Sequence, residues 1–130
     1  MARGHEQYKQ RQEAIAALGR PLARRARSRC ELCEAGGTRL FPFEVAPIPE
    51  EPDTGHAVML CERCIAGATG GSLVPMEWRF LETSAWSDIA PIQVVAVRLS
   101  RRLSDEYRCD WASDLLGMLY LPPEVEDWLE

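Results

Sequence analysis

The sequence lacks the residue patterns on which several large enzyme classes depend. It contains no Gly-rich phosphate loop, no Gly-x-Ser-x-Gly turn and no His-Glu-x-x-His pair, which are the signatures of phosphate-loop NTPases, serine hydrolases and zinc proteases. Histidine is scarce as well, because His56 stands alone between Cys33 and Cys61, where an HNH nuclease would carry paired histidines. We therefore predict no catalytic residue, and the sequence favours a binding protein over an enzyme.

Long hydrophobic runs are also missing. A membrane span needs about 18–20 apolar residues, and the longest candidate, 92–99, is interrupted by Gln93 and Arg98. The first residues lead into a polar stretch without the apolar segment of a secretory signal, so we expect a cytoplasmic protein. In that reducing compartment, the five cysteines are expected to be metal ligands or buried thiols rather than a disulfide framework.

The composition is that of one folded domain with unevenly distributed charge. Hydrophobic residues make up 46% and charged residues 27% of 130 residues, a length too short for a two-domain enzyme. Residues 1–29 carry eight basic and two acidic side chains, whereas the remainder carries seven basic and 18 acidic ones, a net charge of −11. This balance argues against a protein that coats nucleic acid with its whole surface. It is still compatible with contact to nucleic acid through a basic N-terminal arm.

The strongest pattern consists of two Cys-x-x-Cys pairs separated by 27 residues. Each pair forms a tight turn that presents two sulfurs to one ion, and an intervening hairpin brings the turns together around a tetrahedral centre. We predict one structural Zn²⁺, because four thiolates leave no coordination position for a catalytic water. The chemical alternative is a four-thiolate iron site with a redox role; it is disfavoured because Glu34 and Ile65 stand where rubredoxins carry glycine. The expected ligands are Cys30, Cys33, Cys61 and Cys64.

The expected fold class is α+β: a four-cysteine zinc ribbon or treble-clef-like β-hairpin flanked by helices, and mostly helical outside the metal segment. Residues 1–29 should form N-terminal helices with a basic arm, 30–74 the zinc-binding hairpin module, and 75–130 a helical region packed on it as one compact domain. We expect strands at 38–45 and 57–60, followed by a loop marked by Gly67, Gly70 and Gly71. Further helices should open at Pro75, near Asp88, at Asp110 and at Glu124.

The helix that opens near Asp88 is expected to reach Leu103. Its valine-rich part, 94–97, is also compatible with a buried strand. We prefer the helix because an apolar set at helical spacing continues to Leu103. The set consists of Ile92, Val95, Ala96, Leu99 and Leu103.

A basic segment immediately precedes the first cysteine pair. It is either a solvated helix face or an arm that contacts phosphates. Our hypothesis is that a zinc-stabilised adaptor binds a protein or a nucleic acid through this face. Its arginines are Arg20, Arg24, Arg25, Arg27 and Arg29.

Several isolated residues are interpreted as structural. His56 is taken as a strand-end or surface histidine and Cys109 as a packed thiol. The four tryptophans, which all follow the metal segment, are expected to pack in the core or between helices rather than to stack on bases, because acidic residues surround them. Nearby arginines should offset the charge of the metal centre. They are Arg29, Arg39 and Arg63.

Eight separated motifs stand in one order along the chain. They are LGRPLARR at 18–25, SRCELC at 28–33, FEVAP at 43–47, LCERC at 60–64, WRFL at 78–81, SAWS at 84–87, PIQVVA at 91–96 and DLLGMLYL at 114–121. In this order they resemble the N-terminal zinc-ribbon region of the bacterial PhnA-type proteins, a family labelled through an alkylphosphonate-utilisation operon.

The resemblance implies that the four cysteines are metal ligands, and it supplies no catalytic residue. Longer members of the family carry a small C-terminal β-barrel, so this chain is expected to correspond to the N-terminal part or to a short form. The family name suggests the alternative function, metal-assisted hydrolysis of a phosphonate or phosphoester with His56 and neighbouring carboxylates.

Overall fold

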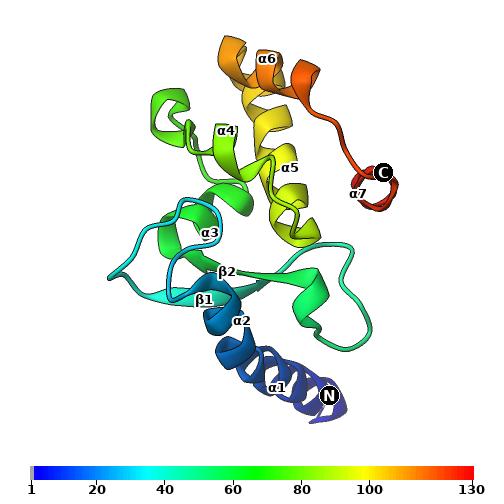
Figure 1. The fold of residues 1–130 in the computed structure, drawn as a ribbon. Coiled ribbons are helices and arrows are strands. Elements are labelled where there is room, and N and C mark those ends of the chain that lie inside the picture. The colour runs from blue at the N-terminus through cyan, green and yellow to red at the C-terminus, as the bar shows by residue number, and fades with distance from the viewer. Residues whose placement is uncertain (1) are drawn as a thin grey trace.

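A computed structural model describes the chain from residue 2 to residue 130, with side chains from residue 4 onward. Figure 1 shows a β-hairpin near the middle of the molecule, with the first two helices on one side of it and the C-terminal helices on the other. This arrangement confirms the α+β class, a four-cysteine hairpin flanked by helices. In chain order the elements are α1 (Ala2–Ala17), α2 (Gly19–Ala26), β1 (Leu40–Glu44), the 3-10 turn η1 (Thr54–His56), β2 (Ala57–Cys61), α3 (Glu62–Ala68), the 3-10 turn η2 (Pro75–Trp78), α4 (Leu81–Ser84), α5 (Ala90–Tyr107), α6 (Asp110–Met118) and α7 (Pro123–Leu129).

The hairpin separates two clusters of apolar side chains. β1 and β2 pair antiparallel from Leu40 opposite Cys61 to Glu44 opposite Ala57, and every residue of β2 is buried. Since successive side chains of a strand point to opposite faces, Ala57 and Met59 meet Leu22 of α2, whereas Val58 and Leu60 join the main core around α5. β2 therefore reads as a continuous apolar run because both of its faces are covered.

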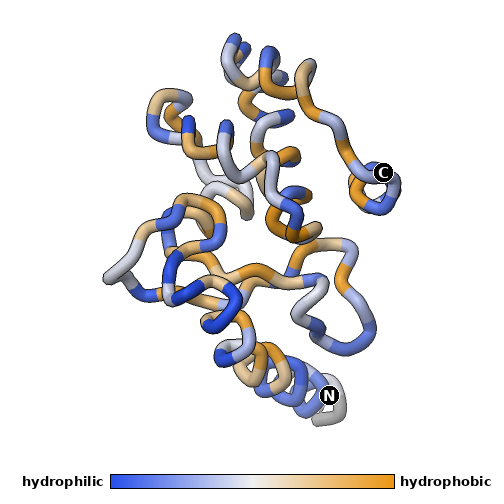
Figure 2. The backbone as a smooth tube through the Cα atoms, viewed as in Figure 1, coloured by the Kyte–Doolittle hydropathy of each residue, from blue (hydrophilic) through white to orange (hydrophobic). Residues whose placement is uncertain are grey.

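The main core is built around α5. Residues 94–97 lie within this helix, so the helical interpretation of the valine-rich stretch is confirmed. The helix begins after Ile89, and no side chain caps it, so the expected cap at Asp88 is wrong. It continues beyond Leu103 to Tyr107 and ends at Arg108, which has the left-handed conformation common after helix ends. In Figure 2 hydrophobic residues are concentrated along α5 and β2.

Three other expectations about local structure need correction. Gly67, expected in a loop, lies instead near the end of α3. Only glycine fits there, because the ring of Trp78 packs against it and an added Cβ would lie 2.7 Å from Cζ2 of that ring. The helix expected from Pro75 is divided into η2 and α4. Asp110 is the first residue of α6 rather than its cap, which is Cys109.

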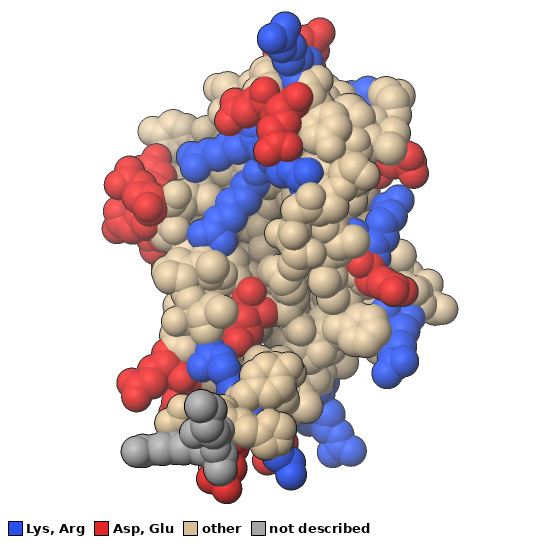
Figure 3. All heavy atoms as spheres, turned by 180° about the vertical axis from the view of Figure 1, so that it is seen from behind, with Lys and Arg blue, Asp and Glu red and all other residues tan. Residues whose placement is uncertain are grey.

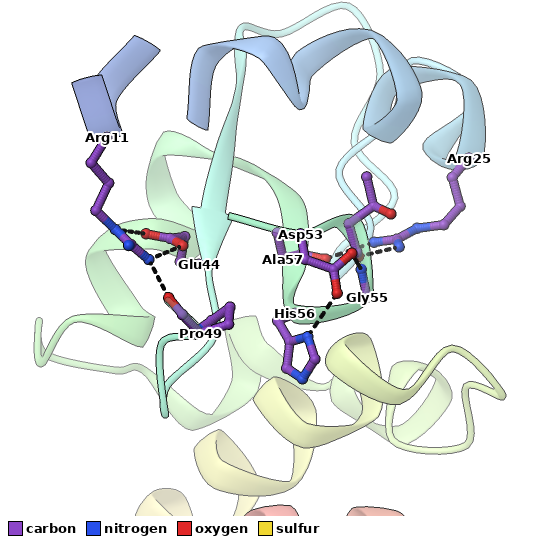
Figure 4. A network of polar contacts seen from close by, with 9 residues as sticks. Arg11, Arg25, Glu44, Pro49, Asp53, Gly55, His56 and Ala57 are labelled. Carbon is purple, nitrogen blue, oxygen red and sulfur yellow. Dashed lines mark hydrogen bonds and ion pairs between the residues drawn. The ribbon is translucent and has the colours of Figure 1, made fainter. Parts of the chain in front are cut away.

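The loop between the two strands is held from both ends of the chain. Arg11 of α1 pairs with Glu44 and donates hydrogen bonds to the carbonyls of Pro49 and Glu50, at 2.9 and 2.8 Å, as Figure 4 shows in part. On the other side, Nε1 of Trp128 in α7 donates to the carbonyl of Ala46 at 2.8 Å. The first and last helices thus anchor the same loop. Among residues 2–130, no helix combines the length and apolar character needed to cross a bilayer.

Candidate metal centre

The fold brings the two cysteine pairs together. Cys30 and Cys33 lie in the turn after α2, Cys61 is the last residue of β2, and Cys64 lies in the first turn of α3. Their four sulfurs all lie within 4.8 Å of one another, and all four are free thiols. The Sγ atoms of Cys33 and Cys61 are 3.7 Å apart. Sulfurs at about 2.3 Å from a tetrahedral Zn²⁺ are themselves about 3.8 Å apart, so the cluster has the dimensions of a metal site.

Backbone hydrogen bonds shape the first cysteine turn. The N–H of Glu34 donates to the carbonyl of Cys30 at 2.8 Å, and the N–H of Cys30 donates to the carbonyl of Ala35 at 3.0 Å. Glu34 itself has a positive φ of 65°, a conformation in which glycine is usual. The turn closes on itself and is positioned by the chain rather than by the metal alone.

The thiols of the cluster influence one another's ionisation. The pKa of Cys30 is lowered to about 4, chiefly because the Cys64 thiol donates a hydrogen bond to its sulfur. The same bond raises the pKa of Cys64, and desolvation by burial raises the pKa of Cys33. Without a cation the cluster therefore favours a thiolate at Cys30 beside protonated Cys33 and Cys64. A bound divalent ion would displace the remaining protons, so metal and protons compete for the same sulfurs.

An ion pair fixes the first cysteine turn to the hairpin. Nε and Nη2 of Arg25 donate to the two carboxylate oxygens of Glu31, each at 2.8 Å, and the Glu31 side chain is only 2% exposed. The N–H of Glu31 donates to the carbonyl of Met59, and the N–H of Met59 donates to Oε1 of Glu31, both at 2.8 Å. Arg25 also donates to the carbonyls of Thr54 and Ala57. Figure 4 shows its guanidinium reaching from α2 to this segment.

This role of Arg25 is not predicted from the sequence, in which Arg25 is one of five arginines of the basic segment. The sequence contains one signal for this ion pair. Glu31 is a charged residue inside the first Cys-x-x-Cys pair, and Arg25 stands six positions before it. The remaining four arginines of the segment are exposed and make no ion pair or side-chain hydrogen bond within residues 2–130. They are Arg20, Arg24, Arg27 and Arg29.

His56 is not part of the sulfur cluster. Its Nδ1 lies 3.0 Å from Oδ2 of Asp53, and its ring packs at 4.9 Å from the ring of Trp128. The backbone N–H of Gly55, and then His56, lower the pKa of Asp53. Within the described residues the only group of side chains arranged to hold a metal ion consists of the four cysteines. The contacts of His56 are those of a residue that joins η1 to α7.

The other singled-out residues divide between the core and the surface. Cys109 and Trp78 are buried in the main core, as expected. Trp86 is 50% exposed in the turn after α4, so the expected packing is wrong for this tryptophan. Arg63 lies over the rings of Trp78 and Phe80, at 5.5 and 5.4 Å from their centroids.

A hollow of about 710 Å³ lies beside the first cysteine turn. Its walls come from the end of α2, from the turn itself and from the α4–α5 connection. The segment around the first cysteine pair contributes Arg27, Arg29 and Glu34 to the lining, and the α4–α5 connection contributes the half-exposed Trp86 and Ser87. No protein-family model, no curated protein and no solved structure matches this chain.

Proposed function

We propose that the four cysteines hold one structural Zn²⁺. Support comes from the sulfur separations and from the burial of Cys30, Cys61 and Cys64. The ion would neutralise the thiolates and link the first cysteine turn to the end of the hairpin. A two-stranded sheet is marginal in isolation, so such a link contributes directly to folding. Membership of the PhnA-type family is likewise our proposal, and it rests on the ordered motifs.

Metal analysis of the purified chain tests the site. We expect one zinc per chain and loss of zinc in Cys30→Ser, with unfolding of the hairpin. Stoichiometric zinc in the Cys30→Ser, Cys61→Ser double variant would contradict the assignment. Stoichiometric iron with thiolate-to-iron absorption bands would support the alternative metal and overturn zinc.

We propose further that the zinc-stabilised domain binds single-stranded nucleic acid in the hollow beside the first cysteine turn. The observation that carries this proposal is that two unpartnered arginines and an exposed tryptophan line the same hollow. Exposed arginines provide a sequence-independent attraction to phosphates, and an exposed indole provides a platform on which a base stacks. A duplex hides its bases, so it cannot use Trp86.

The charge distribution favours a local interface. Two of the four exposed arginines, Arg27 and Arg29, line the hollow together with the exposed Glu34. The rest of the chain after residue 29 carries an excess of acidic residues. Figure 3 shows basic and acidic side chains interspersed on the face that it presents, without a broad field of one sign. Attraction of a polyanion should therefore depend on a few arginines rather than on the protein's overall charge.

Fluorescence anisotropy with a labelled ten-nucleotide oligothymidine tests this proposal. We expect binding that weakens steeply with salt, and a loss of at least tenfold in Arg27→Gln, Arg29→Gln. Glutamine keeps the Cβ and the stem at Arg27, whose φ is 55°. Trp86→Ala should weaken binding by about 1–3 kcal/mol, the range for stacking on one aromatic side chain.

The matched control is Arg101→Gln, an exposed arginine in the middle of α5. It should leave the affinity within about twofold of wild type. Affinity that ignores ionic strength, or that is equal in Arg101→Gln and in the double variant, would contradict the proposal and favour a protein partner for the same face.

A further inference from the structure

A second cavity, of about 260 Å³, lies between β1, the end of α3 and α5. It is smaller than the roughly 300–1,000 Å³ of sites for drug-sized ligands, so its occupant would have to be small. Most of its wall is apolar. The apolar side chains are Phe43, Val45, Ala46, Ala68, Val95 and Leu99.

The charged groups of this wall are almost all satisfied within the protein. Glu44 is paired with Arg11 at 2.7 Å. Arg102 donates to Glu106 and to the carbonyls of Gly67 and Gly70. Arg98 is the exception: it lines the cavity and is half-buried, yet it makes no hydrogen bond and no ion pair within residues 2–130. The cavity therefore has one uncompensated positive charge.

The isolation of Arg98 is unusual for this molecule. The other half-buried arginines, Arg11, Arg25 and Arg102, each donate to a carboxylate and to backbone carbonyls. Burial, and then the nearby charge of Arg101, lower the pKa of Arg98, and no carboxylate acts in the opposite direction. A charge that is partly removed from water without a partner lowers the stability of the fold. A contribution to stability therefore does not explain why an arginine stands at this position.

The same side chain borders a larger hollow beside α7. Glu124, Asp127 and Glu130 line that hollow, but none of them forms an ion pair with Arg98. These carboxylates therefore do not neutralise the charge of Arg98. An anion that enters from solvent would neutralise it.

We propose that this cavity binds a small organic monoanion, a carboxylate with a short apolar chain. The carboxylate would accept the paired N–H groups of Arg98, a geometry for which guanidinium is suited. The chain would lie among the apolar side chains of the wall. One uncompensated charge and an apolar lining together favour such a ligand over a polyphosphate, which carries several charges and no apolar part.

Thermal unfolding of the zinc-loaded full chain provides the test, with sodium hexanoate as probe. Hexanoate should raise the Tm more than acetate does. Hexan-1-ol and sodium chloride at the same concentration should leave the Tm unchanged. Arg98→Met should remove the response to hexanoate. It should also raise the Tm without any ligand, because it replaces an unpaired charge by an apolar side chain of similar length.

The control is Arg101→Met, which should keep the response to hexanoate. Backbone amide shifts in an NMR titration should map to Ala68, Val95 and Leu99, and Arg98→Gln provides the same comparison if the methionine variant does not fold. A lower Tm in ligand-free Arg98→Met would reveal an internal partner and overturn the proposal. An equal response to hexanoate in wild type and in the Arg98 variants would overturn it as well.

Discussion

Replacement of Arg25 by alanine should destabilise the protein far more than loss of a surface arginine. The substitution leaves the Glu31 carboxylate, 2% exposed, without the two hydrogen bonds that balance its charge. Breaking a buried ion pair by removing one partner costs about 3–5 kcal/mol. The Arg25 side chain is itself 23% exposed, so water can enter the vacated space, and we expect about 3 kcal/mol, the lower end of that range.

Urea unfolding followed by circular dichroism, with Zn²⁺ in excess, measures this cost. The matched control is Arg79→Ala, which removes a pair of similar geometry, 2.7 Å from Glu82, whose side chains are 49% and 40% exposed. That variant should lose less than about 1 kcal/mol. The double variant Arg25→Met, Glu31→Leu should recover most of the loss, because apolar residues can replace a buried pair. If Arg25→Ala cost no more than Arg79→Ala, the pair would not hold the first cysteine turn.

Three further outcomes follow from other parts of the structure. Gly67→Ala should destabilise by about 1–2 kcal/mol in urea unfolding, because the overpacking against the buried ring of Trp78 exceeds the gain in helix propensity; an unchanged midpoint would mean that the ring can withdraw. Leu22→Ala should cost about 2–3 kcal/mol by the same measurement, since the side chain is fully buried but belongs to a small cluster; a loss below about 1 kcal/mol would place α2 outside the cooperative core. Zinc affinity, measured by competition with a chelating dye at pH 6 and pH 8, should fall in acid by about tenfold per pH unit for each proton displaced, because the pKa values of Cys33 and Cys64 are raised; an affinity independent of pH would contradict thiolate ligation.

The cysteine cluster and the main helix could be predicted from the sequence because their signals are local. Each Cys-x-x-Cys pair needs only a tight turn, and the 27 residues between the pairs are enough for a hairpin. The apolar set that ends at Leu103 extends over several turns of α5, which favours a helix over the strand that residues 94–97 alone would also allow. These predictions needed no knowledge of contacts between distant segments.

The features that could not be predicted depend on such contacts. Nothing near Gly67 indicates that the ring of Trp78 replaces a side chain there, so the sequence places Gly67 in a loop rather than in α3. Arg25 and Glu31 pair because the chain reverses between α2 and the first cysteine turn, where Arg27 and Ser28 both have positive φ. Neither residue type favours that conformation strongly, so the reversal left little trace in the sequence.

The anchoring of the loop between β1 and β2 has a consequence for the order of folding. Its partners lie far away along the chain: Arg11 precedes Pro49 by 38 residues, and Trp128 follows Ala46 by 82. The contact of Trp128 should form late, because it pays a larger loop-closure entropy than the sulfur cluster, in which Cys33 and Cys61 are 28 residues apart. The sulfur cluster can therefore assemble while the loop is still open. The loop would be completed only when α7 docks, so opening of the native protein should begin there, with hydrogen exchange at Val45 faster than at the middle of β2.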